Sequence, residues 1–314
     1  MRGPMRRTLV TGAAGFIGSR IVERLLEAGV FVVGIDSFDE TLNSANLRKS
    51  FISHLTHPNF TFLEENLLTV HMETLVANLD SVVHLAATPG LVPSWQSFEK
   101  YLENNVLGTF RLAKALAQTG NHCKIIHAST SSIYGMNATG DESQLPMPVS
   151  PYGLTKLASE HIWNSFFQEN TDRVTILRYF SVYGPRQRED MAWQKFIRLM
   201  LDDQPISLTN SGGHTRSFTF IDDVADITVK LANGQSSGGV YNIAGDEEIN
   251  VLEGINLIAK ILNREPRFNF LDSRPGDQIR TKGNNSRAKL ELGFNPKFKF
   301  SEGIQKQITD VMGR

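Results

Sequence analysis

A glycine-rich turn near the N-terminus constrains the fold of this chain more than any other feature. The segment at residues 11–18, Thr-Gly-Ala-Ala-Gly-Phe-Ile-Gly, follows a short apolar stretch and opens a segment of helical periodicity. Gly12 allows a tight turn, Gly15 lets the backbone approach a pyrophosphate, and Gly18 lets helix and strand pack closely. Because the turn joins a strand to a helix N-terminus, it predicts a site for a dinucleotide.

An acidic residue stands where a dinucleotide site of this kind requires one. Asp36 ends the second apolar strand, 18 residues after Gly18. Its carboxylate is expected to accept hydrogen bonds from the adenosine ribose hydroxyls and to repel a 2′-phosphate, which favours NAD over NADP. Arg20 or Arg48 would weaken this preference if its side chain reached the ribose.

Strands and helices alternate through the first half of the chain. Apolar strands are expected at residues 8–10, 30–35, 60–63, 81–85, 124–127 and 174–178, with helices between them such as 17–27, 108–118 and 155–168. This alternation predicts an α/β fold with a doubly wound parallel sheet of the Rossmann type.

The pattern becomes polar and less regular after residue 184. We therefore assign residues 1–180 to a dinucleotide-binding Rossmann domain and residues 181–314 mainly to a smaller mixed α/β domain that binds the substrate. Residues 218–246, which include an apolar strand at 240–243, are expected to return to the first domain.

Composition excludes several classes of protein. The 314 residues, 40% hydrophobic and 21% charged, are typical of a globular protein with two domains. A net charge of −1 gives no field to attract nucleic acid or a membrane surface, and no apolar run approaches the roughly 20 residues that span a bilayer. The only cysteine, Cys123, precedes an apolar strand, which favours packing over a role as nucleophile. We expect no disulfide, no metal and no signal peptide, and a reducing, cytoplasmic location.

A tyrosine and a lysine four residues apart mark a second site. Tyr152 and Lys156 would lie on one face of a helix. The lysine ammonium and a positive nicotinamide are expected to lower the tyrosine pKa toward neutrality, so that the phenolate can take a proton from a sugar hydroxyl as hydride leaves the same carbon. A hydroxyl-rich strand end, Ser-Thr-Ser-Ser-Ile-Tyr-Gly at residues 129–135, precedes the pair and is suited to orienting a substrate.

Together these segments resemble the extended short-chain dehydrogenase/reductase family of nucleotide-sugar epimerases and dehydratases. The resemblance runs nearly end to end, and further segments that carry it are residues 84–87, 104–109, 178–185, 215–218 and 274–277. It implies that the catalytic residues are Thr130, Tyr152 and Lys156. It implies that NAD is bound by Gly12, Gly15, Phe16, Ile17, Gly18, Asp36, Asn66, Leu67, Leu85, Ala87, Thr88, Asn104, Tyr152 and Lys156.

The same resemblance implies a set of substrate-binding residues. These are Pro89, Gly90, Thr130, Ser131, Ser132, Ser181, Arg188, Arg216 and Arg274. Arg216 and Arg274 match the arginines that hold the nucleotide diphosphate, a task that suits the planar guanidinium. Relatives commonly form dimers through two helices per subunit, so a homodimer through the helices after Tyr101 and Tyr152 is expected.

The strand end distinguishes members of the family. Dehydratases carry Asp-Glu after the threonine and UDP-glucuronate decarboxylases typically carry a glutamate, whereas this chain has Ser131 and Ser132, which favours epimerisation. Residues 65–69, 130–132 and 183–192, together with Ser181, look most like the UDP-glucuronate 4-epimerases, in which small hydroxyl residues can bind the sugar carboxylate. One departure is Val92, because many relatives have arginine in that loop.

The resemblance thus implies epimerisation at C4 of a UDP-linked sugar through a 4-keto intermediate, with UDP-glucuronate converted to UDP-galacturonate. Two other enzymes share this site, a UDP-glucose 4-epimerase and a reductase of 4-keto-6-deoxy nucleotide sugars. A protein that senses NAD without catalysis is a further alternative, since the fold alone does not determine function.

Overall fold

A sheet of seven parallel strands forms the centre of the protein in a computed structural model that describes residues 5–38, 51, 53–209, 212–235, 238–272 and 278–313. In spatial order the strands are β12 (Gly239–Ile243), β7 (Val174–Tyr179), β5 (Lys124–Thr130), β4 (Ser81–His84), β1 (Arg7–Thr11), β2 (Phe31–Asp36) and β3 (Phe60–Glu64). Leu9 of β1 lies opposite Val33 of β2 on one side and Val82 of β4 on the other. The strand order reverses between β1 and β4, which confirms the predicted doubly wound fold.

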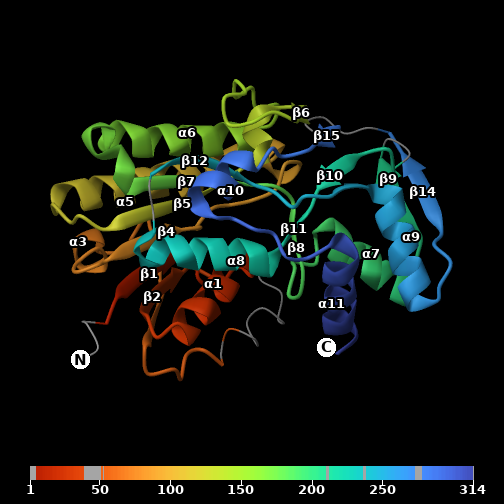
Figure 1. Cartoon of the computed structure of the whole chain (residues 1–314), viewed down its shortest axis with the longest axis horizontal. Coiled ribbons are helices and arrows are strands. Elements are labelled where there is room, and N and C mark those ends of the chain that lie inside the picture. Colours follow the sequence, from red (N-terminus) through yellow and green to blue (C-terminus); the bar gives the residue numbers. More distant parts are fainter. Residues whose placement is uncertain are drawn as a thin grey trace.

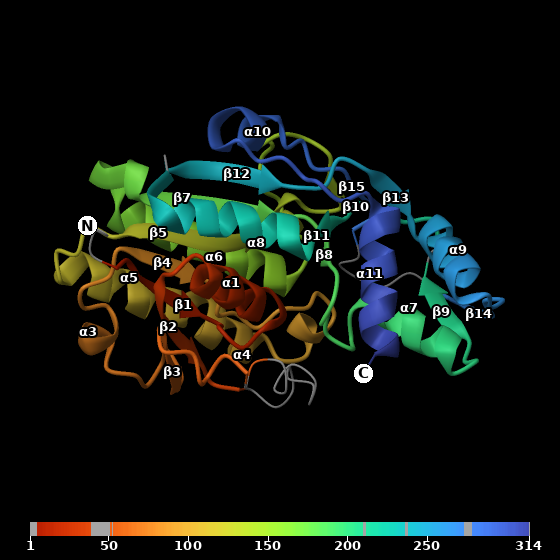
Figure 2. The ribbon, with the colours of Figure 1, turned by 60° about the horizontal axis from the view of Figure 1, so that its bottom comes forward.

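Helices cover both faces of this sheet (Figures 1 and 2). On one face α1 (Phe16–Glu27) packs against α8 (Ile221–Lys230), and on the other α5 (Gly108–Gln118) packs against α6 (Pro151–Phe166). The shorter helices are α3 (Met72–Leu75), α4 (Phe98–Tyr101) and α10 (Ser286–Leu292). No helix among the described residues is long and apolar enough to cross a membrane.

A second group of elements lies beyond the carboxyl ends of the strands (Figure 2). Its helices are α7 (Ala192–Leu201), α9 (Val251–Leu262) and α11 (Phe300–Met312). Its strands form three small sheets: β13 (Glu248–Asn250) with β10 (Thr215–Ser217), β15 (Arg280–Thr281) and β6 (Asn137–Ala138); β11 (Thr219–Phe220) with β8 (Val182–Tyr183); and β14 (Phe268–Leu271) with β9 (Ile206–Thr209).

The chain crosses between these two parts more than once. Strand β12 and helix α8 come after residue 180, yet β12 pairs with β7 in the large sheet and α8 packs on α1. The division into domains at residue 180, with residues 218–246 returning to the first domain, remains our proposal.

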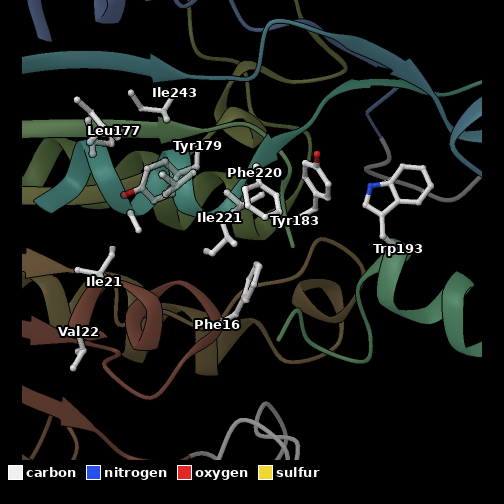
Figure 3. Close-up of a cluster of buried hydrophobic side chains, with 14 of the residues drawn as sticks. Phe16, Ile21, Val22, Leu177, Tyr179, Tyr183, Trp193, Phe220, Ile221 and Ile243 are labelled. Carbon is white, nitrogen blue, oxygen red and sulfur yellow. The ribbon is translucent and has the colours of Figure 1, made fainter. Parts of the chain in front are cut away.

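One apolar cluster joins the two parts (Figure 3). Ile21 and Val22 of α1 pack in it with Leu177 of β7, and it continues through Phe220 of β11 to Trp193 of α7, all of them buried. Because the core is continuous, the small sheets are held firmly against the end of the large one.

Helix α6 begins earlier than the sequence predicted. It runs from Pro151 to Phe166, whereas periodicity placed it at residues 155–168. The Ser150 hydroxyl accepts a hydrogen bond from the Gly153 amide at 3.1 Å, and Pro151 occupies the first helical position, where its missing N–H is not needed. Both Tyr152 and Lys156 therefore lie within the helix.

Candidate active site

A cavity of about 430 Å³ opens at the carboxyl ends of the central strands, where the strand order reverses. Open α/β sheets bind their ligands at this place. The lining includes every predicted cofactor residue: Gly12, Gly15, Phe16, Ile17, Gly18, Asp36, Asn66, Leu67, Leu85, Ala87, Thr88, Asn104, Tyr152 and Lys156. The part each plays there stays a prediction.

The glycine turn has the geometry that its sequence predicted. Gly12 has φ +70°, and a Cβ atom there would lie 2.8 Å from the Ala86 amide nitrogen. A Cβ atom on Gly18 would lie 2.0 Å from the Gly12 carbonyl oxygen, so helix α1 packs on the turn too closely for any side chain. Phe16 and Ile17 bring the first turn of α1 to the cavity. The amides of this turn fit the pyrophosphate of a dinucleotide.

Asp36 lies at the edge of the same cavity. Its carboxylate accepts hydrogen bonds from the amides of Ala14 and Phe38, both at 3.0 Å, which fixes the side chain beside the turn. The Arg20 guanidinium donates to Asp222 of α8 at 2.7 Å and is thus committed to α8. Arg48, the other cation that would have weakened the preference for NAD, lies outside the described residues.

The loop that follows β4 is held by two neighbouring asparagines in a π-helical segment, Leu102–Leu107. The Asn105 side chain accepts from the Thr88 amide at 2.7 Å and donates to the Thr88 carbonyl at 3.1 Å, while Asn104 donates to the Thr88 hydroxyl at 2.7 Å. Asn105 also donates to Thr155, the residue before Lys156, at 3.0 Å. Sequence reasoning found Asn104 and missed Asn105, although the paired amides were a visible signal.

Tyr152, Thr130 and Lys156 meet in the cavity. The Thr130 hydroxyl is hydrogen-bonded to the Tyr152 phenol, and it donates to the Ser132 hydroxyl at 3.1 Å. Lys156 lies one helical turn beyond Tyr152 and is buried. The cavity therefore brings together a proton acceptor (Tyr152), an assisting hydroxyl (Thr130) and a cation (Lys156). These groups are suited to removing a proton from an alcohol.

Burial sets the pKa of both ionisable groups in this set. It raises the pKa of Tyr152, against the lowering effects of the Thr130 hydrogen bond and of the Arg188 charge. It also lowers the pKa of Lys156 to about 8, although the Glu160 carboxylate opposes this shift. In the protein alone, desolvation of the phenolate outweighs the Arg188 charge. The lowering of the Tyr152 pKa expected from Lys156 together with a positive nicotinamide stays a prediction for the NAD-bound enzyme.

Tyr101 is a second tyrosine at the site that sequence reasoning did not assign to it. Its ring packs edge-on against Tyr152, with the centroids 6.2 Å apart, and its hydroxyl donates to the carbonyls of Pro89 and Gly90. Burial raises the pKa of Tyr101 to about 12, so it remains a donor. Pro89 lines the cavity, but Gly90, predicted to bind substrate, is not among the lining residues.

The predicted substrate residues Ser131, Ser132, Ser181, Arg188 and Arg216 also line the cavity. Arg188 donates to both carboxylate oxygens of Asp190, at 2.9 and 2.6 Å.

Arg216 donates to the carbonyls of Thr215 and Ile279 and to that of Gln278. The buried Gln278 side chain, which sequence reasoning missed, donates to the carbonyls of Ser131 and Gly135. Arg274 lies outside the described residues.

This fold and this cavity define a dinucleotide-dependent enzyme that oxidises or reduces an alcohol carbon. The chain belongs to the NAD dependent epimerase/dehydratase family, whose model matches residues 8–244. NAD is therefore its cofactor, in agreement with the glycine turn and Asp36.

Several known proteins are similar to this chain over nearly their whole length. The solved structure of UDP-glucuronic acid 4-epimerase from Bacillus cereus, in complex with UDP-glucuronic acid and NAD, is 38% identical with a TM-score of 0.91, and the match covers 98% of this chain and 99% of that one. An uncharacterized UDP-glucose epimerase of Bacillus subtilis (strain 168), YtcB, is 37% identical over 306 residues, 96% of each chain. The UDP-glucuronate 4-epimerase of Thermodesulfobacterium geofontis is 30% identical over 309 residues, 96% of this chain and 94% of that one.

Proposed function

We propose that this enzyme interconverts UDP-glucuronate and UDP-galacturonate by NAD-dependent epimerisation at C4 of the sugar. The observation that carries the proposal is a cluster of small hydroxyl side chains, Thr130, Ser131, Ser132 and Ser181, in the same cavity as Tyr152. Serine hydroxyls are suited to donating hydrogen bonds to a carboxylate. The Bacillus cereus structure with UDP-glucuronic acid and NAD supports this choice of substrate.

The acidic residues of the cavity favour epimerisation over loss of water. Among the described residues that line it, the only carboxylates are Asp36 and Glu65, and both follow or end strands beside the glycine turn. Loss of water needs an acid and a base beside the sugar, whereas epimerisation needs only one group that takes a proton and returns it. Tyr152 suffices for that.

A positive charge for the sugar acid is available despite Val92. Val92 is 37% exposed and is not among the residues that line the cavity. Arg188 does line it. The rival substrate is UDP-glucose, which the name of the Bacillus subtilis relative favours. The ion pair between Arg188 and Asp190 also favours it, because it partly neutralises the charge that would bind the sugar carboxylate.

The residues of the site divide the work between them. Bound NAD supplies an acceptor and donor of hydride, so that the C4 alcohol is oxidised to a ketone and reduced again. Tyr152 takes the proton of the 4-hydroxyl and later returns it, assisted by the Thr130 hydroxyl, while Lys156 favours the phenolate by its charge. The ketone is a β-keto acid when the sugar is glucuronate. Ser131, Ser132 and Ser181 hold its carboxylate near the carbonyl plane, where loss of carbon dioxide is unfavourable.

Product analysis tests the proposed function directly. Purified protein incubated with UDP-glucuronate, without added cofactor, is expected to give a mixture with UDP-galacturonate that chromatography separates, because NAD is regenerated in each cycle. UDP-glucose serves as the parallel substrate. Turnover of UDP-glucose with none of UDP-glucuronate would make the rival correct, and a strict need for added NADH would indicate a reductase.

We further propose that the enzyme is a homodimer that pairs through the helices after Tyr101 and Tyr152. Leu102, Leu107 and Phe110 are 40–46% exposed and Leu154 is 51% exposed on this side of the molecule, where helices α5 and α6 pack side by side. Large apolar side chains gathered in this way are typical of an interface. A cytoplasmic location also remains a proposal, which rests on the single cysteine.

The oligomeric state provides the measurement. Light scattering is expected to give twice the mass of the chain, and Phe110→Glu is expected to shift it toward the monomer because it places a charge within the paired helices. Leu290→Glu is the matched control, since Leu290 is 86% exposed on α10. A Phe110→Glu protein that kept its doubled mass would exclude this face.

A further inference from the structure

Three buried glutamines from separate elements meet behind the substrate side of the cavity. Gln187 follows β8, Gln194 lies on α7 and Gln307 lies on α11, and none is more than 3% exposed. The Gln307 side chain donates to the Gln187 side-chain oxygen at 2.8 Å and to that of Gln194 at 3.3 Å. Its own oxygen accepts from the Gly184 amide at 3.2 Å. Buried amides linked in this way hold their neighbours in one arrangement.

The segment that these glutamines hold is the one that carries Arg188. The Gln187 side chain donates to the Val182 carbonyl at 3.1 Å and accepts from the Gln194 backbone amide at 3.2 Å. These two bonds connect the end of the segment 182–188 to its start and to helix α7. Val182 and Arg188 line the cavity, whereas the three glutamines do not. The charge of Arg188 also acts on Tyr152, where it opposes the rise in pKa that burial causes.

Other contacts secure the outer side of the same segment. Asp310, one turn after Gln307 on α11, accepts from the Arg186 amide at 2.8 Å, and the Arg186 guanidinium pairs with Glu23 of α1 at 2.9 Å. Arg186 has φ +65°, a left-handed conformation that an arginine adopts only when its surroundings impose it. The contact from α11 therefore helps to hold this segment in its bent conformation.

We propose that Gln307 is a positioning residue for the substrate: from the C-terminal helix, outside the cavity, it sets where Arg188 stands at the sugar. This inference rests on the proposed function, in which Arg188 contacts the UDP-sugar. Gln307 does not line the cavity, and the glycine turn and Asp36 are held by other contacts, so we expect it to have no role in binding NAD. Its effect therefore falls on the sugar and spares the cofactor.

The test compares Gln307→Met with wild type. Methionine keeps the length and volume of the side chain but removes both amide functions, so the Gly184 amide and the side-chain oxygens of Gln187 and Gln194 lose their hydrogen bonds to Gln307. We expect kcat/KM for UDP-glucuronate, and its affinity measured by calorimetry, to fall about tenfold while the NAD content is unchanged. Gln305→Met, at an exposed position on the same helix, is the matched control and is expected to behave as wild type.

A double variant separates positioning from general support of the fold. In an Arg188→Ala background, Gln307→Met is expected to lower kcat/KM less than about threefold, because the group it positions is already gone. The same tenfold loss in both backgrounds would overturn the proposal. Gln307→Glu is the second variant if the methionine protein does not fold. It keeps an acceptor for Gly184 but sets a carboxylate oxygen against Gln187, so unchanged sugar affinity in this protein would also overturn it.

The outcomes also separate this inference from the proposed function. A wild-type protein that neither binds nor converts UDP-glucuronate refutes both. A wild-type protein that converts it, with Gln307→Met equally effective, refutes the positioning role alone.

Discussion

Replacing Tyr152 with phenylalanine is expected to lower kcat for epimerisation by about 10²- to 10⁴-fold, the range for loss of a general acid–base group. The phenol lies beside the Thr130 hydroxyl in the cavity, and we assign the exchange of the sugar proton to it. The ring itself should stay in place, because its edge-on packing against Tyr101 does not involve the hydroxyl. The measurement is the rate of sugar conversion at saturating UDP-glucuronate.

Tyr101→Phe is the matched control for this loss. It removes a hydroxyl from the neighbouring ring, but that hydroxyl donates to two carbonyls and has a pKa of about 12, so it does not exchange protons near neutrality. We expect it to lose less than about tenfold, through movement of the Pro89 loop. Tyr152→Phe activity within a few-fold of wild type would mean that another group is the base.

Ser181→Ala is expected to weaken the use of UDP-glucuronate by about one to two orders of magnitude, because a hydrogen bond to a charged group contributes about 1.5–3 kcal/mol. UDP-glucose, which has no carboxylate, should be affected much less. Some UDP-pentose should also form, since a loosened carboxylate can leave the plane of the ketone. Steady-state kinetics on both sugars measure the contrast, and equal losses on the two would show that Ser181 supports the site without recognising the acid.

Ser181→Asn adds a readout that alanine cannot give. Ser181 has φ +30°, a left-handed conformation in which asparagine is more common than serine. We expect the asparagine protein to melt at a higher temperature than wild type and yet to use UDP-glucuronate less well. A lower melting temperature would show that the backbone there is not strained.

Local patterns were sufficient for the sheet and for the glycine turn. Strand positions followed from runs of apolar residues, and the turn was recognisable because Gly12 and Gly18 have no room for a side chain. The start of α6 was missed for a local reason as well, because Ser150-Pro151 signals a helix start that apolar periodicity does not register.

The rest of the site depends on contacts between residues far apart in the chain. Tyr101 reaches Tyr152 and Gln278 reaches Ser131 only after the sheet has formed, so neither role is written in a local motif. The rise in the Tyr152 pKa in the protein alone could not be predicted from the sequence for a related reason. Burial is a property of the folded molecule, and at this position it exceeds the effect of nearby charge.

The place of Gln307 in the chain has a consequence for how the protein is made. The glycine turn and Asp36 are synthesised well before Gln307, which lies on α11. Because domains generally fold in the order in which they are synthesised, the part that binds NAD can fold before α11 is present to hold the segment that carries Arg188. A chain shortened before α11 would thus lack the contact that we propose to position Arg188.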